Sequence, residues 1–153
     1  MNTRTAGSER GIATAIEILQ AGGIVALPTE TVYGLAGEAL SPEACTAIFE
    51  AKDRPLSDPL IVHLPSLEWL SRLTSPAPLA LALAEKFWPG PLTMVLPRNS
   101  CVPDIVTAGQ DTVAVRMSAH PAFRSVVEGF GKPLAAPSAN RFGRISPTAA
   151  EHV

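Results

Sequence analysis

The segment Pro133-Leu-Ala-Ala-Pro-Ser-Ala-Asn140, which continues into Arg141-Phe-Gly-Arg-Ile-Ser-Pro-Thr148, joins a short apolar stretch to a dense run of polar side chains. Residues 134–136 favour a buried strand. Hydrogen-bond donors follow at once, at Ser138, Asn140, Arg141, Arg144, Ser146 and Thr148. Core packing does not require so many donors at the end of a buried strand, whereas a polyanion such as a nucleoside triphosphate does. The segment therefore predicts a phosphate-binding loop beside a strand.

A second cluster of donors, Lys52-Asp-Arg54-Pro55, lies between an expected helix and the apolar run Leu60-Ile-Val-His-Leu64. In extended backbone, residues two apart face the same way, so Lys52 with Arg54, and Ser138 with Asn140, are expected to present paired donors to one ligand. Lysine supplies a point charge and arginine a bidentate fork. Lys52 is expected to be exposed and to contribute little to stability.

Helices and strands are expected to alternate along the chain. Hydrophobic periodicity and capping residues predict helices at 9–21, 41–51, 77–87 and 121–130, and strands at 24–27, 60–64, 93–96, 112–116 and 134–136. This alternation predicts an α/β fold, with a twisted, mostly buried mixed sheet flanked by helices. Length favours a single domain over residues 1–153. Ser146-Pro147 has the pattern of a further helix start, yet the chain ends at Val153, so we expect a C-terminal part to be missing.

Composition narrows the class of protein. Hydrophobic residues make up 46% of the chain, which excludes global disorder. A net charge of −2 argues against nucleic-acid binding by bulk charge. Cys45 and Cys101 lack metal or redox spacing and are expected to be free thiols in a reducing compartment. No run is long enough for a membrane helix, and residues 1–10 lack the apolar core of a signal peptide, so we expect a cytoplasmic protein without a membrane partner.

Several common site motifs are absent from the sequence. There is no phosphate-binding G-x-x-x-x-G-K-[ST], no dinucleotide G-x-G-x-x-G and no hydrolase G-x-S-x-G. His63, His120 and His152 lack the spacing of metal ligands, so no metal site is expected. Each candidate also has a simpler reading: Lys52 and Arg54 as a solvated helix end, His63 as a core histidine, and Arg116 as a surface residue.

Six motifs occur in one order along the chain: Leu27-Pro-Thr-Glu-Thr-Val-Tyr-Gly-Leu35, Lys52-x-Arg54-Pro55, Pro59-Leu-Ile-Val-His63, Trp88-Pro-Gly-Pro-Leu-Thr93, Val113-Ala-Val-Arg116 and Ala136-Pro-Ser-Ala-Asn140. Together they resemble the YrdC-type domain of the threonylcarbamoyl-AMP synthase family, over roughly residues 11–153. The resemblance implies an enzyme that makes L-threonylcarbamoyladenylate and pyrophosphate from L-threonine, bicarbonate or CO₂, and ATP. That product serves the N6-threonylcarbamoyladenosine modification of tRNA.

The resemblance also implies roles for individual residues. The catalytic set that it implies is Lys52, Arg54, Ser138 and Asn140. The implied ATP contacts are Arg54, Asp58, Thr112, Ser138, Asn140 and Ser146, and the implied threonine contacts are Thr31, His63, Arg116 and Ala136. Mg²⁺ is expected to arrive with ATP, because no carboxylate cluster offers a dedicated cage. No prosthetic group is expected, and the downstream partners are the threonylcarbamoyl-transfer machinery.

Two alternatives stay open at this level. One is an RNA-binding module of the same fold, with weak tRNA contact through basic residues. The other is the carbamoyltransferase domain of hydrogenase-maturation proteins, although the acylphosphatase-like region and cysteine-rich zinc motifs of that class are absent from this sequence.

Overall fold

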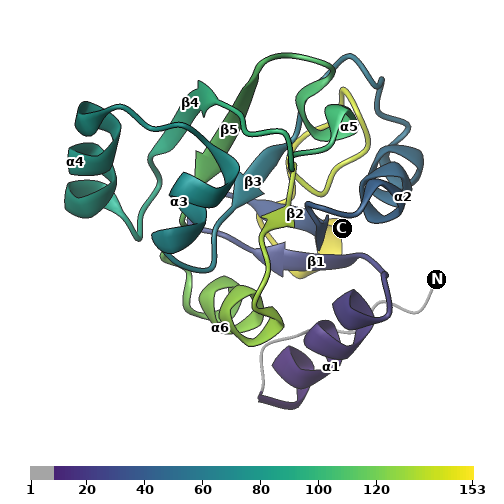
Figure 1. Ribbon diagram of the computed structural model, residues 1–153. Helices are drawn as coiled ribbons and strands as arrows, with labels where there is room; N and C mark the ends of the chain where they lie inside the picture. The colour runs from purple at the N-terminus through teal and green to yellow at the C-terminus, as the bar shows by residue number, and fades with distance from the viewer. Residues whose placement is uncertain (1–8) are drawn as a thin grey trace.

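The computed structural model describes residues 9–153, and its centre is a six-stranded sheet in the order β1-β2-β6-β3-β5-β4 (Figure 1). The strands are β1 (Val25–Pro28), β2 (Tyr33–Glu38), β3 (Ile61–His63), β4 (Thr93–Pro97), β5 (Thr112–Arg116) and β6 (Leu134–Ala135). Strands β3 and β5 are parallel, and all other neighbours are antiparallel. The expected α/β fold with a mixed sheet is therefore confirmed.

Two groups of helices pack against this sheet. Helices α1 (Glu9–Gln20) and α6 (Pro121–Phe130) pack against one another and against β1. The second group comprises α2 (Pro42–Lys52), α3 (Glu68–Leu73), α4 (Pro78–Phe87) and α5 (Asp104–Thr107). Figure 1 shows α1 and α6 together on one side of the sheet. A short 3₁₀ turn, Ala150–His152, ends the chain.

The core is divided between these two groups of helices. On one side, Ile48 and Phe49 of α2 pack with Val62 and Val115 of the central strands. On the other side, α1 and α6 bury their apolar faces against β1 and β6, and the buried residues include Leu19, Leu27, Phe123, Val127 and Leu134. A sheet covered on both faces requires apolar residues on both, which explains why its strands read as nearly continuous hydrophobic runs.

The register of β3 and β5 decides where two polar side chains point. Val62 lies opposite Val115, and His63 opposite Arg116. Because successive strand residues point to opposite faces and both valines belong to the α2 side, His63 and Arg116 face the α6 side. The His63 ring lies 4.6 Å from the Phe123 ring of α6, in agreement with this direction.

The predicted elements agree with the structure except at a few places. Ser41 caps α2 by accepting a hydrogen bond from the Ala44 amide at 3.2 Å, as its sequence pattern predicts. Strand β2 and the short helices α3 and α5 are missing from the prediction. The helix predicted at Ser146-Pro147 is wrong, because residues 145–149 are irregular and only the 3₁₀ turn follows.

The two cysteines differ in environment, and neither forms a disulfide within the described residues. Burial raises the pKa of the Cys45 thiol to about 12, with the charges of Glu38 and Glu43 adding to the effect. Cys101 is exposed.

None of the helices that the structure describes is long and apolar enough to cross a membrane.

Candidate functional site

Lys52 is the last residue of α2 and is only 2% exposed. Its ammonium group donates hydrogen bonds to the carbonyl oxygens of Ser138 and Asn140 in the loop that follows β6. Burial, and secondarily the charge of Arg54, lower the pKa of Lys52 to about 8, whereas Asp58 acts in the opposite direction. The expectation of an exposed lysine is therefore wrong. Lys52 holds the loop after β6 against the end of α2.

Arg54 lies beside Lys52 but is not paired with it in extended backbone. Asp53, between them, has the left-handed conformation (φ 51°) that ends α2. The Arg54 side chain folds over its own loop, donating to the carbonyls of Asp58 at 3.1 Å and Pro59 at 2.9 Å. It also forms an ion pair of 2.8 Å with the Asp58 carboxylate. The expected ATP contacts Arg54 and Asp58 are thus brought together, and the carboxylate offsets part of the arginine charge.

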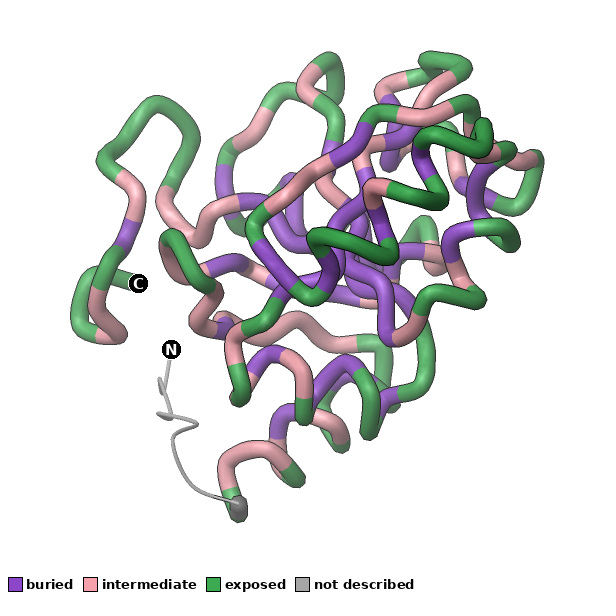
Figure 2. The backbone as a smooth tube through the Cα atoms, turned by 90° about the vertical axis from the view of Figure 1, so that its left-hand side faces the viewer, coloured by how far each residue is buried: buried purple, intermediate pink, exposed green. Residues whose placement is uncertain are grey.

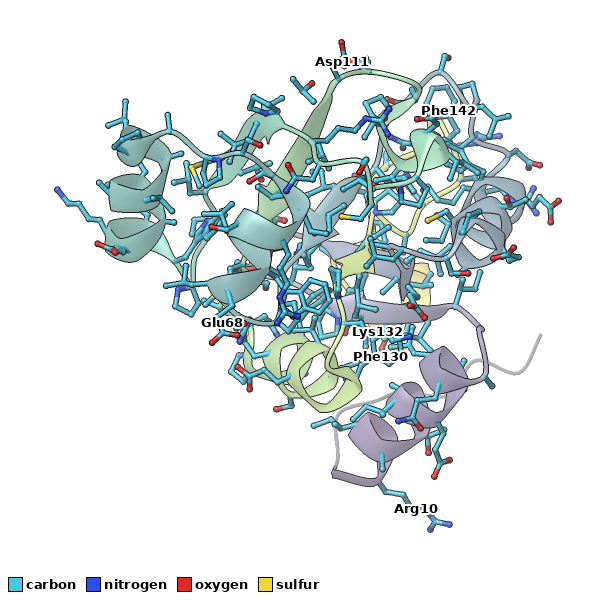
Figure 3. All side chains as sticks on the ribbon, in the orientation of Figure 1. Arg10, Glu68, Asp111, Phe130, Lys132 and Phe142 are labelled. Atoms are coloured by element: carbon cyan, nitrogen blue, oxygen red, sulfur yellow. The ribbon has the colours of Figure 1, made fainter. Side chains whose placement is uncertain are left out.

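Asn140 closes the loop that follows β6. Its side-chain nitrogen donates to the carbonyls of Arg141 and Arg144, both at 2.8 Å. The backbone amide of Phe142 donates a hydrogen bond to the Lys52 carbonyl at 2.9 Å, which is a second attachment of the loop to the end of α2. Figure 3 shows Phe142 on the α2 side of the molecule. The amide donors of Asn140 are therefore used inside the loop, whereas its Oδ1 atom is buried and has no hydrogen-bond partner within residues 9–153.

The chain beyond β6 also pairs with the beginning of β2. The Leu35 amide donates to the Pro137 carbonyl at 2.9 Å, and the Ala139 amide to the Tyr33 carbonyl at 2.7 Å. Gly34 lies in this contact, where an added Cβ atom would meet the Cβ atom of Ala136 at 3.4 Å. The two segments therefore lie in direct contact at Gly34. This contact brings Ala136 and Ser138 beside the turn that carries Thr31.

Arg116, at the end of β5, is a buried guanidinium group with too few partners. Its side chain is 10% exposed, and its nearest anion is the Glu30 carboxylate, with the Arg116 nitrogen 3.6 Å from Oε2. The Nε atom and one terminal nitrogen of Arg116 have no hydrogen-bond partner among the residues that the structure describes. Buried polar groups are nearly always paired, so two donors without a hydrogen-bond partner on a buried cation are chemically suited to an anionic ligand.

His63 lies opposite Arg116 in the register and is 3% exposed. Burial and the neighbouring Arg116 charge lower the pKa of His63 to about 3, although Glu30 and a hydrogen bond with the Ala136 backbone act in the opposite direction. The ring is therefore neutral at pH 7. Its Nδ1 atom has no hydrogen-bond partner within residues 9–153. It is a buried polar atom beside the free donors of Arg116.

Thr31 belongs to the turn between β1 and β2. Thr29 organises that turn, because its hydroxyl donates to the Val32 carbonyl at 2.7 Å and accepts from the amides of Thr31 and Val32. Within residues 9–153 the Thr31 hydroxyl has one hydrogen-bond partner, the Thr29 hydroxyl at 3.2 Å, and Thr31 is exposed. Thr29 therefore has the structural role, and Thr31 remains accessible.

The hydroxyl groups of three other candidates, Thr112, Ser138 and Ser146, make no hydrogen bond within residues 9–153. Thr112 opens β5 and therefore lies at the opposite end of that strand from Arg116. Ser146 lies in the exposed C-terminal stretch, which stands out from the rest of the chain at the left of Figure 2. Apart from Thr112, the candidates thus form two groups, one around Lys52 and the loop after β6, the other around Arg116.

Sequence reasoning missed Glu30 as part of this arrangement. Its carboxylate accepts hydrogen bonds from the Ser118 hydroxyl at 2.6 Å and from the Ala119 amide at 2.5 Å. These partners lie 88 and 89 residues away in the chain, so local sequence carried no sign of them. The one available signal was the acidic residue in Pro28-Thr-Glu-Thr31, directly after a buried strand.

Residues 9–153 contain no group of three or more His, Cys, Asp or Glu side chains that could hold a metal ion.

Comparisons with known proteins identify the family of this chain. The model of the Sua5/YciO/YrdC family, described as "Telomere recombination", matches residues 17–153. The threonylcarbamoyl-AMP synthase of Pyrococcus abyssi is 49% identical over 154 residues, which cover 100% of this chain and 45% of that protein. The threonylcarbamoyl-AMP synthase of Marinobacter nauticus is 39% identical over 135 residues, covering 87% of this chain and 71% of that protein.

A solved structure adds a match in three dimensions. The crystal structure of P. abyssi Sua5 complexed with L-threonine superposes with a TM-score of 0.91 at 49% identity, covering 99% of this chain and 45% of that one. The chain spans about half the length of the first relatives that it matches. Because the family match extends over residues 17–153 and includes a relative covered over more than two thirds of its length, the chain belongs to the Sua5/YciO/YrdC family.

Proposed function

We propose that this chain carries the catalytic domain of an L-threonylcarbamoyladenylate synthase, which uses L-threonine, bicarbonate and ATP. The single observation that carries the proposal is Arg116, a buried guanidinium group with two unpartnered nitrogens. A planar fork of this kind binds a carboxylate with two parallel hydrogen bonds. The relatives named threonylcarbamoyl-AMP synthase, and the Sua5 structure with L-threonine, support an amino-acid carboxylate as that ligand.

In this proposal the neighbours of Arg116 select the rest of the amino acid. A neutral imidazole that donates through one nitrogen accepts through the other. The unpartnered Nδ1 atom of His63 therefore suits a hydroxyl or amine donor of the ligand. Thr31 supplies a further hydroxyl from the β1–β2 turn, and the backbone of Ala136 lines the proposed amino-acid pocket. A site built to bind a hydroxyl strongly rejects a ligand without one, which would distinguish threonine from valine.

The ATP phosphates are assigned to the loop after β6. Lys52 fixes the shape of this loop by donating hydrogen bonds to the carbonyls of Ser138 and Asn140. The hydroxyl groups of Ser138 and Ser146 and the guanidinium group of Arg54 then face the phosphates. Thr112 is assigned to the nucleotide from the start of β5. Mg²⁺ comes with ATP as part of the substrate.

The chemistry requires positioning more than a protein nucleophile. The threonine amine attacks bicarbonate, and water leaves to give a carbamate. A carbamate oxygen then attacks the α-phosphorus, and pyrophosphate leaves. Charge on the phosphates grows at this step, so cations and fixed donors provide the main stabilisation. The product is a reactive mixed anhydride that must pass to a transferase acting on tRNA, which places the proposed reaction in the cytoplasm.

The first prediction concerns substrate demand. Pyrophosphate release should require ATP, Mg²⁺, L-threonine and bicarbonate together, because the carbamate formed from threonine is the attacking group. A coupled pyrophosphate assay with each component omitted in turn measures this demand, and L-valine in place of L-threonine is the matched control. Release at the same rate without threonine would exclude the proposed reaction.

Replacing Arg116 should separate the two ligands. Arg116→Ala should weaken threonine binding by roughly 1.5–3 kcal/mol, because a charge-assisted contact is lost, and should leave ATP binding unchanged. Isothermal calorimetry with each ligand measures both affinities. The control is Arg98→Ala, which removes a guanidinium group paired with Asp104 outside the site. Equal losses for both ligands would assign Arg116 a structural role.

Lys52→Met should affect the loop and the nucleotide rather than threonine. Loss of the ammonium leaves the Ser138 and Asn140 carbonyls without their donor, at a local cost on the order of 1–3 kcal/mol. We expect faster amide exchange at Ala139 and roughly tenfold slower pyrophosphate release. Lys132→Met, which removes an exposed lysine paired with Glu38, serves as the control. Unchanged exchange together with slow turnover would contradict the positioning role.

The proposal also includes weak binding of tRNA. The exposed loop after β6 carries Arg141 and Arg144 on either side of Phe142, which is 49% exposed. Guanidinium groups and an aromatic ring suit an unpaired stretch of RNA. Binding of unmodified tRNA should weaken steeply with salt and should fall in the Arg141→Ala/Arg144→Ala double variant. Filter-binding titrations measure this, and equal affinity of variant and wild type would exclude the loop.

A further inference from the structure

The Glu30 side chain lies between three parts of the chain that approach one another only in the folded molecule. It belongs to the β1–β2 turn, and it accepts hydrogen bonds from Ser118 and Ala119, which follow β5. Ser118 is 1% exposed, and its hydroxyl also accepts a hydrogen bond from the amide of His120, directly before α6, at 3.3 Å. Glu30 therefore links the turn, the end of β5 and the beginning of α6.

The charge of Glu30 faces Arg116 without satisfying it. The Oε2 atom lies 3.6 Å from the guanidinium nitrogen, which is close enough for an ion pair and too long for a hydrogen bond. Both carboxylate oxygens are instead engaged by Ser118 and Ala119. Burial alone would raise the pKa of Glu30, but these two hydrogen bonds and the Arg116 charge hold it below its usual value, so the group is an anion at pH 7.

We propose that Glu30 is the positioning residue of the amino-acid pocket: it latches the turn carrying Thr31 to the segment after β5 and holds Arg116 with its free donors open to a ligand carboxylate. The latch joins the Thr31 turn to the segment after Arg116, and within residues 9–153 the hydrogen bonds and ion pair of the Glu30 side chain go to Ser118, Ala119 and Arg116, none of which is assigned to ATP. This inference rests on the proposed function. It adds a residue that acts through Arg116 rather than on the substrate.

Glutamine is a sharp probe of this latch, because it keeps the shape and removes the charge. In the native site, one oxygen faces the Ala119 N–H and the other faces the Ser118 hydroxyl and the Arg116 guanidinium. If the glutamine NH₂ group points toward Ala119, it faces the N–H donor of that residue and no hydrogen bond forms. If it points the other way, it faces the guanidinium donors of Arg116. Neither orientation restores the native contacts.

The experiment compares Glu30→Gln with the wild-type chain by calorimetry, using L-threonine and ATP as separate ligands. We expect threonine affinity to fall about tenfold and ATP affinity to stay unchanged. Glu38→Gln is the matched control, since Glu38 forms an ion pair of 2.8 Å with Lys132 outside the pocket and its loss should change neither affinity. Equal affinity of wild type and Glu30→Gln, tighter threonine binding by the variant, or equal losses for both ligands would each overturn the proposal.

Two further measurements separate positioning from general structure. In the Arg116→Ala background, Glu30→Gln should cause a smaller loss of threonine affinity than in the wild-type chain, because part of its effect acts through Arg116; a full additive loss would contradict this route. By NMR, the Ala119 amide should exchange faster in Glu30→Gln while the amides of α1 stay unchanged. If the wild-type chain binds no threonine, the proposed function fails, and the Ala119 exchange rate alone decides whether the latch exists: an unchanged rate overturns it.

Discussion

The hydrogen bonds from the Lys52 ammonium to the Ser138 and Asn140 carbonyls are the contact on which the site depends. They join the end of α2 to a loop 86 and 88 residues later. A buried ammonium is costly unless polar groups replace its water, and backbone carbonyls do so here. Because α2 also packs on the central strands, the loop after β6 is fixed to the core and not only to the surface.

The charged residues of the site differ in how completely they are compensated. Lys52 has two carbonyls, and Arg54 has the Asp58 carboxylate and two carbonyls. Arg116 has only a carboxylate at 3.6 Å, itself engaged by other donors. Among these three cations, Arg116 is the one with buried nitrogens that have no hydrogen-bond partner within residues 9–153. Incomplete pairing therefore distinguishes Arg116 from Lys52 and Arg54, whose side chains donate to backbone carbonyls of the chain itself.

The sequence predicted the fold class and most of the elements because hydrophobic period and capping act locally. Ser41-Pro42-Glu43 marks the start of α2, and the apolar alternation of residues 112–116 marks β5, without any tertiary information. Strand β2 was missed, since Tyr33–Glu38 contains two glycines and owes its extended form to pairing with β1 and β6. A tertiary contact also overrides the local helix signal at Ser146, because the carbonyl of Pro147 accepts a hydrogen bond from the Tyr33 amide at 2.8 Å.

Site residues were predictable as a set, but their roles were not. Polar clusters at strand ends identified Lys52, Arg54, Ser138 and Asn140, yet burial of Lys52 and the internal use of the Asn140 amide depend on contacts far apart in the chain. Glu30 illustrates the limit most clearly, because its partners follow β5 and its neighbours in sequence are threonines. Only the folded register brings it within reach of Arg116.

That register has a consequence for how the protein can change over evolution. Strand β5 is five residues long, so Thr112 and Arg116 at its ends are about 13 Å apart along a hydrogen-bonded strand. Insertion or deletion of one residue within β5 would turn the Arg116 guanidinium into the apolar layer shared by Val62, Val115 and Ile48. The pairing of β5 with β3 therefore requires that the number of residues within β5 stay unchanged.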